Sequence, residues 1–186
     1  PLFTVLKIKI DGIPGTLPIT EAEVVSKTGL ELGKDHLLRI SLKRIEMGLY
    51  QIPWVKSVSV GRMLPDTIRI ELNFRTAVAL SQNERGSLQY IDDKGQRFGE
   101  VDFRIPTDLP VVKGDVPIQD ALQLIRLWKE LKLEDVAQLS SLEFDPDRGF
   151  RLIAHYFLGE KSIGTVIRLG TMPPEAREAL TQRGAS

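Results

Sequence analysis

The alternation of apolar and polar residues is strongest between Val55 and Phe74. In the second half of this segment the apolar positions are Ile68, Ile70, Leu72 and Phe74, with polar residues between them. In the first half, Val58, Val60 and Arg62 fall on one parity. A period of two is typical of a half-buried strand. Pro65 and Asp66 lie between the halves and favour a turn, so the pattern predicts an antiparallel hairpin.

A helical pattern precedes the hairpin. Apolar residues recur at helical spacing at Leu38, Leu42, Ile45 and Leu49. Ser41 is a suitable cap for a helix that runs to about Gln51, and Pro53 stops it and directs the chain into the sheet. Trp54, which is followed by Val55, is the largest apolar group at this point. We interpret Trp54 as an anchor in or beside the core rather than as a binding hot spot.

A strand and a first helix come earlier in the chain. Leu6, Ile8 and Ile10 alternate with polar residues, which predicts a strand. Thr20 followed by Glu23 forms a capping box, and Gly29 supplies a left-handed residue for the end of that helix. The first 75 residues therefore read as β-α-α-β-β, with both helices covering one face of the sheet.

From Thr76 the pattern changes to short strands and turns. The segment 109–114 suits a loop or an edge strand, and 118–131 predicts a helix with Leu131 on its apolar side. Further strands are expected at 77–80, 88–91, 96–98, 139–144, 150–157 and 165–169, and a short helix at 174–180. The predicted fold class is α+β, and the second part is a mostly antiparallel β-domain with one or two helices.

Composition and charge exclude several classes of function. The chain has 186 residues with 25 basic and 25 acidic side chains, so it lacks the basic excess that drives nucleic-acid binding. It has no cysteine, which excludes disulfides, thiolate catalysis and zinc–thiolate sites. No apolar run reaches the ~18 residues that a membrane span needs. The chain begins at Pro1 without a methionine, and we expect it to be an excised fragment.

Three segments superficially suit a metal site, a phosphate site or an acid–base pair. Asp145, Asp147 and Gly149 resemble a calcium loop, but Tyr156 stands at the twelfth position, where a carboxylate is needed. Gly159–Ser162 has the Lys-Ser end of a phosphate loop, but it lacks the glycine immediately before the lysine and the one further upstream. Asp92 and Asp93 are adjacent in a turn and point apart, which does not suit acid–base work. We therefore expect no catalytic residue, no metal and no cofactor.

Several segments in their order resemble one known family. They are Asp11–Gly12, 37–49, 52–60 with Pro53–Trp54–Val55, 64–72 with Pro65–Asp66, 74–79, Tyr90–Asp92 with Gly95 and Phe98, Leu109–Pro110 with Gly114, and 166–170. Together they are similar to the extracytoplasmic region of the bacterial cell-division family FtsQ, called DivIB in Gram-positive bacteria. The chain departs from the family pattern at 74–77, where a Glu-Arg pair with a nearby proline is usual, and at Gly61, where a larger residue is common.

The resemblance implies a POTRA domain at 3–75 and an FtsQ-type β-domain at 76–186 that lacks its C-terminal strands. It implies a non-enzymatic divisome scaffold that binds FtsB and FtsL, with FtsW and FtsI as further candidates, and that helps to recruit and regulate septal peptidoglycan synthesis. The expected location is the periplasmic side of the inner membrane at the division septum, with a single membrane-spanning helix before Pro1.

The resemblance also implies partner-binding residues. Ser57, Val60 and Arg62 are expected on a partner surface of the POTRA domain, although Val60 suits the core equally well. Arg62 is expected to be exposed, so that its charge can be reversed without loss of folding. From its position in the turn before Phe150, Arg148 is a further candidate contact for an acidic partner, and the alternative is an ordinary exposed turn residue, which is the commoner case. Because the family's main FtsB contact lies on a later strand, we expect this fragment to fold but to bind FtsB poorly, with 165–169 as an exposed edge.

Two other classes stay open at this point. A POTRA-bearing outer-membrane assembly or secretion factor would show several POTRA repeats, whereas this chain shows a single module. An enzyme would need a catalytic constellation that the sequence does not present, and screens for hydrolase activity would test it.

Overall fold

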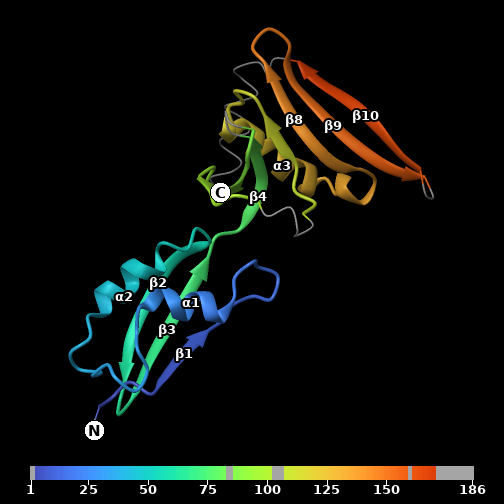
Figure 1. The fold of residues 1–186 in the computed structure, drawn as a ribbon. Helices are drawn as coiled ribbons and strands as arrows, with labels where there is room; N and C mark the ends of the chain where they lie inside the picture. The colour runs from blue at the N-terminus through green and yellow to red at the C-terminus, as the bar shows by residue number, and fades with distance from the viewer. Residues whose placement is uncertain (1–2, 83–85, 102–106, 159–160, 171–186) are drawn as a thin grey trace. The chain divides into compact units, whose positions relative to one another are not determined.

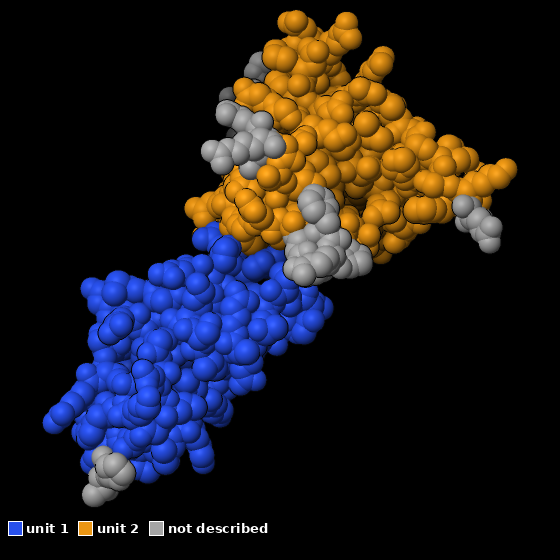
Figure 2. Space-filling model, viewed as in Figure 1, with its two compact units in different colours: residues 1–75 blue, residues 76–186 orange. Residues whose placement is uncertain are grey.

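The computed structural model describes residues 3–82, 86–101, 107–158 and 161–170 (Figure 1). The chain divides into two compact units, unit 1 with residues 1–75 and unit 2 with residues 76–186 (Figure 2). In the part of the chain that the structure describes, no helix is both long and apolar enough to cross a membrane. The helix expected at 174–180 lies outside the described residues.

Unit 1 has the order β-α-α-β-β that the sequence predicted. Its elements are β1 (Lys7–Asp11), α1 (Glu21–Thr28), α2 (Leu42–Leu49), β2 (Val55–Met63) and β3 (Thr67–Phe74). The sheet order is β1-β3-β2, in which β1 is parallel and β2 antiparallel to the central strand β3. The predicted hairpin is confirmed, and both helices pack on one face of the sheet (Figure 1).

The helix ends of unit 1 follow local rules. The Thr20 hydroxyl accepts a hydrogen bond from the Glu23 amide at 3.2 Å, and Gly29 ends α1 with φ of 63°. The Ser41 hydroxyl accepts from the Arg44 amide at 3.3 Å at the start of α2. These caps are confirmed, but Leu38 precedes α2 instead of extending its apolar face, and its side chain is 54% exposed.

The core of unit 1 lies between the sheet and the helices. Ile68, Ile70 and Leu72 from β3 are buried against Val24 of α1 and against Ile45 and Leu49 of α2. The half-buried Trp54 packs against this core, and its carbonyl accepts from the Arg75 amide at 2.8 Å. Pro53–Val55 therefore forms the turn from α2 into β2. At the opposite end of the hairpin, the Asp66 carbonyl accepts from the Leu6 amide at 2.9 Å.

Unit 2 is built on a seven-stranded sheet. Its strands are β4 (Ala77–Gln82), β5 (Leu88–Asp92), β6 (Arg97–Phe98), β7 (Val111–Lys113), β8 (Gln138–Asp145), β9 (Gly149–Leu158) and β10 (Lys161–Gly170), in the order β10-β9-β8-β7-β4-β5-β6. Four of the neighbouring pairs are antiparallel, while β7 is parallel to both β4 and β8.

Two sequence expectations for this sheet need correction. Val111–Lys113 is an interior strand and not an edge or a loop, because only the tertiary fold brings β4 and β8 to its two sides. Strand β10 begins at Lys161, four residues before the predicted start, and pairs with β9 along almost its whole length. Lys161–Gly164 lacks an alternating apolar pattern, so the sequence did not predict its pairing.

Helix α3 (Ile118–Glu130) covers one face of this sheet (Figure 1). Ala121, Leu124, Ile125 and Trp128 are buried against Val112, Leu142 and Leu152 of the strands. Leu131 is the residue after the helix and is exposed, so its predicted place on the apolar side is wrong. A short 3-10 helix, η1 (Leu133–Asp135), connects α3 to β8.

Acidic residues close two tight turns of unit 2. The buried Asp92 carboxylate accepts from the Lys94 amide at 3.0 Å and from the Gln96 amide at 2.8 Å. The Asp145 carboxylate accepts from the amides of Asp147 at 2.9 Å and Arg148 at 3.1 Å. Both aspartates thus stabilise turns before their strands, as Asx turns do.

Candidate partner-binding surfaces

The three expected partner residues in the hairpin of unit 1 do not share one surface. Cross-strand partners lie on the same face of a sheet. Val60 and Arg62 pair with Ile70 and Ile68, whose side chains point to the helices, whereas Ser57 pairs with Asn73 on the opposite face. The two faces cannot be presented together to one partner. The spacing itself accounts for this, because Ser57 lies an odd number of residues from both Val60 and Arg62, and side chains alternate between the two faces along a strand.

Val60 belongs to the core. Its side chain is 9% exposed and packs among the buried residues of unit 1, so of its two interpretations the structural one holds. Ser57 remains accessible on the open face of the sheet, where its hydroxyl accepts from the Asn73 amide nitrogen at 2.9 Å.

Arg62 has a structural role that the sequence did not predict. Its Nε donates to the Leu37 carbonyl at 2.8 Å, and its Nη2 donates to the Ile40 carbonyl at 2.7 Å. These carbonyls lie in the loop before α2. Arg62 is exposed, as the sequence predicted, but it also holds this loop against the sheet, so we now expect reversal of its charge to lower stability.

We expect Arg62→Glu to lower the free energy of unfolding of unit 1 by about 1.5 kcal/mol, since both charge-assisted hydrogen bonds are lost. Lys43→Glu, at an exposed position in the first turn of α2, is the control and should change stability by less than about 0.5 kcal/mol. Urea unfolding followed by circular dichroism measures both. Equal stability of the Arg62 variant and the wild type would show that the two hydrogen bonds from Arg62 to the loop do not stabilise unit 1.

The open face of the sheet of unit 1 carries a chain of ion pairs. Arg69 donates from Nε to the Asp11 carboxylate at 2.8 Å, and its Nη2 lies 3.1 Å from Glu71. The hydrogen bond that Arg69 donates to Asp11, together with the negative charges of Asp11 and Glu71, raises the pKa of Arg69, so the guanidinium stays charged. All three side chains are substantially exposed, and exposed pairs contribute little to stability. This face is polar and largely neutralised.

Strand β10 is an edge of the second sheet. One side of β10 is hydrogen-bonded to β9, and no other described strand pairs with its second side. Apolar side chains project from it at Ile163, Val166 and Leu169, all of them exposed. An edge of this kind presents unpaired backbone N–H and C=O groups to an added strand.

A row of charges runs across the sheet to this edge. Strand register places Lys113, Glu143, Arg151 and Arg168 side by side on β7, β8, β9 and β10. Glu143 pairs with Lys113 at 3.7 Å and with Arg151 at 3.2 Å. Arg168 ends the row and has no ion pair with any described residue. The row therefore leaves a positive charge at the open edge.

Arg148 lies close to the end of this row. It is exposed in the turn between β8 and β9, and with Glu143, Arg151 and Arg168 it lines a hollow of about 560 Å³. Its guanidinium, like that of Arg168, has no carboxylate partner among the described residues. The structure thus brings the predicted Arg148 together with Arg168, which the sequence did not single out because pairing across β9 and β10 was needed to place it.

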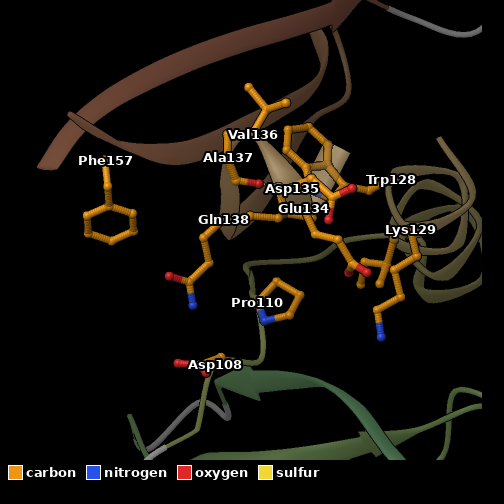
Figure 3. A pocket seen from close by; sticks show the side chains of 12 residues that line it. Asp108, Pro110, Trp128, Lys129, Glu134, Asp135, Val136, Ala137, Gln138 and Phe157 are labelled. Atoms are coloured by element: carbon orange, nitrogen blue, oxygen red, sulfur yellow. Dashed lines mark hydrogen bonds between the residues drawn. The ribbon is translucent and has the colours of Figure 1, made fainter. Parts of the chain in front are cut away.

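A separate groove lies between the end of α3, η1 and the beginning of β8 (Figure 3). It has a volume of about 470 Å³, and Trp128, Val136 and Phe157 contribute apolar surface to it. Asp108, Glu134 and Asp135 add carboxylates, and Lys129 adds one cation. The sequence did not reveal this groove, since its walls come from separate elements.

The described residues contain no group of three or more metal-ligating side chains. The His155 imidazole lies 3.3 Å from the Ser162 hydroxyl, but no carboxylate orients this pair among the contacts of the described residues. Unit 1 has the order β-α-α-β-β, and unit 2 is a sheet in which one outermost described strand, β10, has one side without a strand partner among the described residues.

Comparisons with known proteins specify the family. The model for the FtsQ-type POTRA domain matches residues 3–73, and the model for the C-terminal region of cell division protein FtsQ/DivIB matches residues 79–182. The chain therefore belongs to the FtsQ/DivIB family of cell division proteins, which is a family of non-enzymatic scaffolds.

Named relatives agree with this assignment. Cell division protein FtsQ of Geobacter sp. (strain M21) is 25% identical over 162 residues, which cover 80% of this chain and 58% of that protein. FtsQ of Caulobacter vibrioides (strain NA1000 / CB15N) is 33% identical over 108 residues, which cover 58% of this chain and 35% of that protein. FtsQ of Myxococcus fulvus is 30% identical over 112 residues, or 53% and 39% of the two chains. The match thus spans about three fifths or less of each relative.

Proposed function

We propose that this chain is the extracytoplasmic part of a bitopic inner-membrane division protein. In this proposal the protein binds FtsB and FtsL and helps to recruit and regulate septal peptidoglycan synthesis, without catalysing a reaction. The observation that carries the proposal is the match of two FtsQ family models, one to each unit and in the family's order. The proposal includes a membrane-spanning helix upstream of Pro1, a periplasmic location at the division septum, and FtsW and FtsI as further partners.

The β10 edge offers a physical route to partner binding. An extended segment can add to a free strand edge through main-chain hydrogen bonds, while side chains on alternate positions supply specificity. Arg148 and Arg168 lie at one end of this edge without carboxylate partners among the described residues. An acidic residue of the added segment would complete the row in which Glu143 already lies between Lys113 and Arg151.

The POTRA unit supplies a second surface in this proposal. With Val60 buried and Arg62 bonded to the loop before α2, Ser57 is the expected residue that remains on the open face of the sheet. We propose this open face as the recruitment surface. The substitution Ser57→Arg adds bulk and charge there without disturbing the core, and it should reduce septal localisation while the melting temperature is unchanged. Unaltered localisation would exclude Ser57 from the surface.

The FtsB proposal is tested by titrating residues 1–186 with a periplasmic segment of FtsB in isothermal calorimetry. We expect Arg148→Glu and Arg168→Glu each to weaken binding by about tenfold, because a completed ion pair becomes a repulsive one. Lys43→Glu in unit 1 is the control for net charge and should bind as the wild type does. Wild-type affinity in both arginine variants would show that the β10 end is not the FtsB site.

A second titration compares the FtsB affinity of this chain with that of a protein extended to the native C-terminus. The family resemblance places the main FtsB contact on a later strand, so the extended protein should bind the FtsB segment more tightly than residues 1–186. Equal affinities would make that strand dispensable and would leave the β10 edge as the main contact.

A further inference from the structure

The groove beside α3 has features that the proposed FtsB site does not use. It is formed by the last turn of α3, by η1, by the first residues of β8 and by Asp108–Pro110 (Figure 3). Phe157 of β9 forms one wall, while Trp128 and Lys129 lie on the opposite side (Figure 3). Phe157 and Arg148 lie at opposite ends of β9, which separates the two regions by about 30 Å of strand.

The groove exposes large apolar side chains. Val136 is 73% exposed and Phe157 is 62% exposed, although both flank a concave surface. Covering them would remove apolar area from water, which is the main favourable term in association. The described residues of unit 2 do not cover these two side chains.

The shape of the groove is held by the fold. The Trp128 indole N–H donates to the Ala137 carbonyl at 3.2 Å, which fixes the connection between η1 and β8 against the helix. Trp128 itself is largely buried in the core, and Leu139 next to it is buried as well. A ligand would therefore meet a preformed site with a small ordering cost.

The rim of the groove is acidic. Asp108, Glu134 and Asp135 contribute three carboxylates, and Lys129 contributes one ammonium group. Within the described part of the chain, none of these three carboxylates forms an ion pair or a side-chain hydrogen bond. The site therefore carries a net negative charge next to exposed apolar surface, whereas the Arg148–Arg168 end carries free positive charge.

We propose that this groove binds a short peptide segment of a protein partner in which a large apolar side chain is flanked by Arg or Lys. The apolar side chain lies between Phe157 and Trp128, and the basic residues lie over Glu134, Asp135 and Asp108. Charge complementarity of this kind selects the partner and speeds association more than it raises affinity. Since the Arg148–Arg168 end favours acidic segments, the two regions take segments of opposite charge.

The test is a titration of the ¹⁵N-labelled chain with the peptide acetyl-GRLFRG-amide, followed by NMR. We expect the Trp128 indole N–H and the amides of Val136 and Gln138 to shift, and the indole N–H of Trp54, the other of the two tryptophans, to stay in place. Raising the salt from about 0.05 M to about 0.5 M should weaken binding, since exposed charges are screened. The peptides acetyl-GELFEG-amide and acetyl-GRSSRG-amide should give much smaller shifts.

Matched variants distinguish binding in the groove from a general effect of the net charge of the protein. The double variant Glu134→Gln, Asp135→Asn should weaken peptide binding by about fivefold. The control is the double variant Asp115→Asn, Asp147→Asn, which removes two exposed carboxylates elsewhere in unit 2 and should leave peptide binding unchanged. Phe157→Ser removes an exposed apolar wall and should also weaken binding. No shift at the Trp128 indole at about 2 mM peptide, equal weakening in both double variants, or equal binding of the acidic peptide would overturn the proposal.

Discussion

Trp54→Ala is expected to destabilise unit 1 by about 3 kcal/mol, at the lower end of the range for aromatic truncations because the ring is half-buried. The indole packs against the core at the turn between α2 and β2, and truncation leaves a cavity there. Urea unfolding followed by far-ultraviolet circular dichroism measures the change. Loss of partner recruitment would then follow from unfolding.

Trp54→Phe is the control, since it keeps an aromatic ring and should cost about a third of that energy. The alternative is that Trp54 is a binding hot spot. An alanine variant that keeps its melting temperature and yet fails to reach the division site would establish the hot spot and contradict the role as an anchor.

Gly48→Ala should lower the stability of unit 1 by about 2 kcal/mol, although alanine is the better helix former. Gly48 lies inside α2 where this helix crosses α1, and a Cβ atom there would collide with the backbone carbonyl of Lys27. A backbone oxygen cannot rotate away, so the helices must separate, at a cost of about 3 kcal/mol. The gain of about 1 kcal/mol in helix propensity offsets only part of this cost.

Gly61→Ala is the matched control, because a Cβ atom at Gly61 in β2 meets nothing within 4 Å. The control should be neutral or slightly stabilising, since glycine in a strand has a larger conformational entropy to lose. Thermal unfolding of the two variants compares them directly. A Gly48→Ala protein as stable as the control would show that α1 and α2 can move apart without loss.

Local elements of this protein could be predicted from its sequence because their causes are local. Thr20, Ser41 and Gly29 satisfy helix ends within a few residues, and the alternation from Ile68 to Phe74 needs only a strand with one buried face. The family could be recognised for a similar reason, since Pro53–Val55 and Pro65–Asp66 occupy turns that the chain makes by itself.

Placement of side chains depended on contacts between distant segments. Arg62 lies on the expected strand, but the carbonyls of Leu37 and Ile40, which are distant in the sequence, decided that its side chain binds within the fold. Glycine lowers helix propensity, so Gly48 is unfavourable for α2 by local rules alone. Only the tertiary structure shows that the Lys27 carbonyl leaves no room for a larger residue there.

The candidate sites were decided in the same way. Arg168 joins Arg148 only through the pairing of β9 with β10, and the groove of Trp128, Val136 and Phe157 exists only where α3 meets the sheet. Periodicity in a sequence reports which residues are apolar, but it does not report which distant backbone lies beside them. Cross-strand register and helix–sheet packing, which are long-range interactions, therefore set the surfaces that this protein offers to partners.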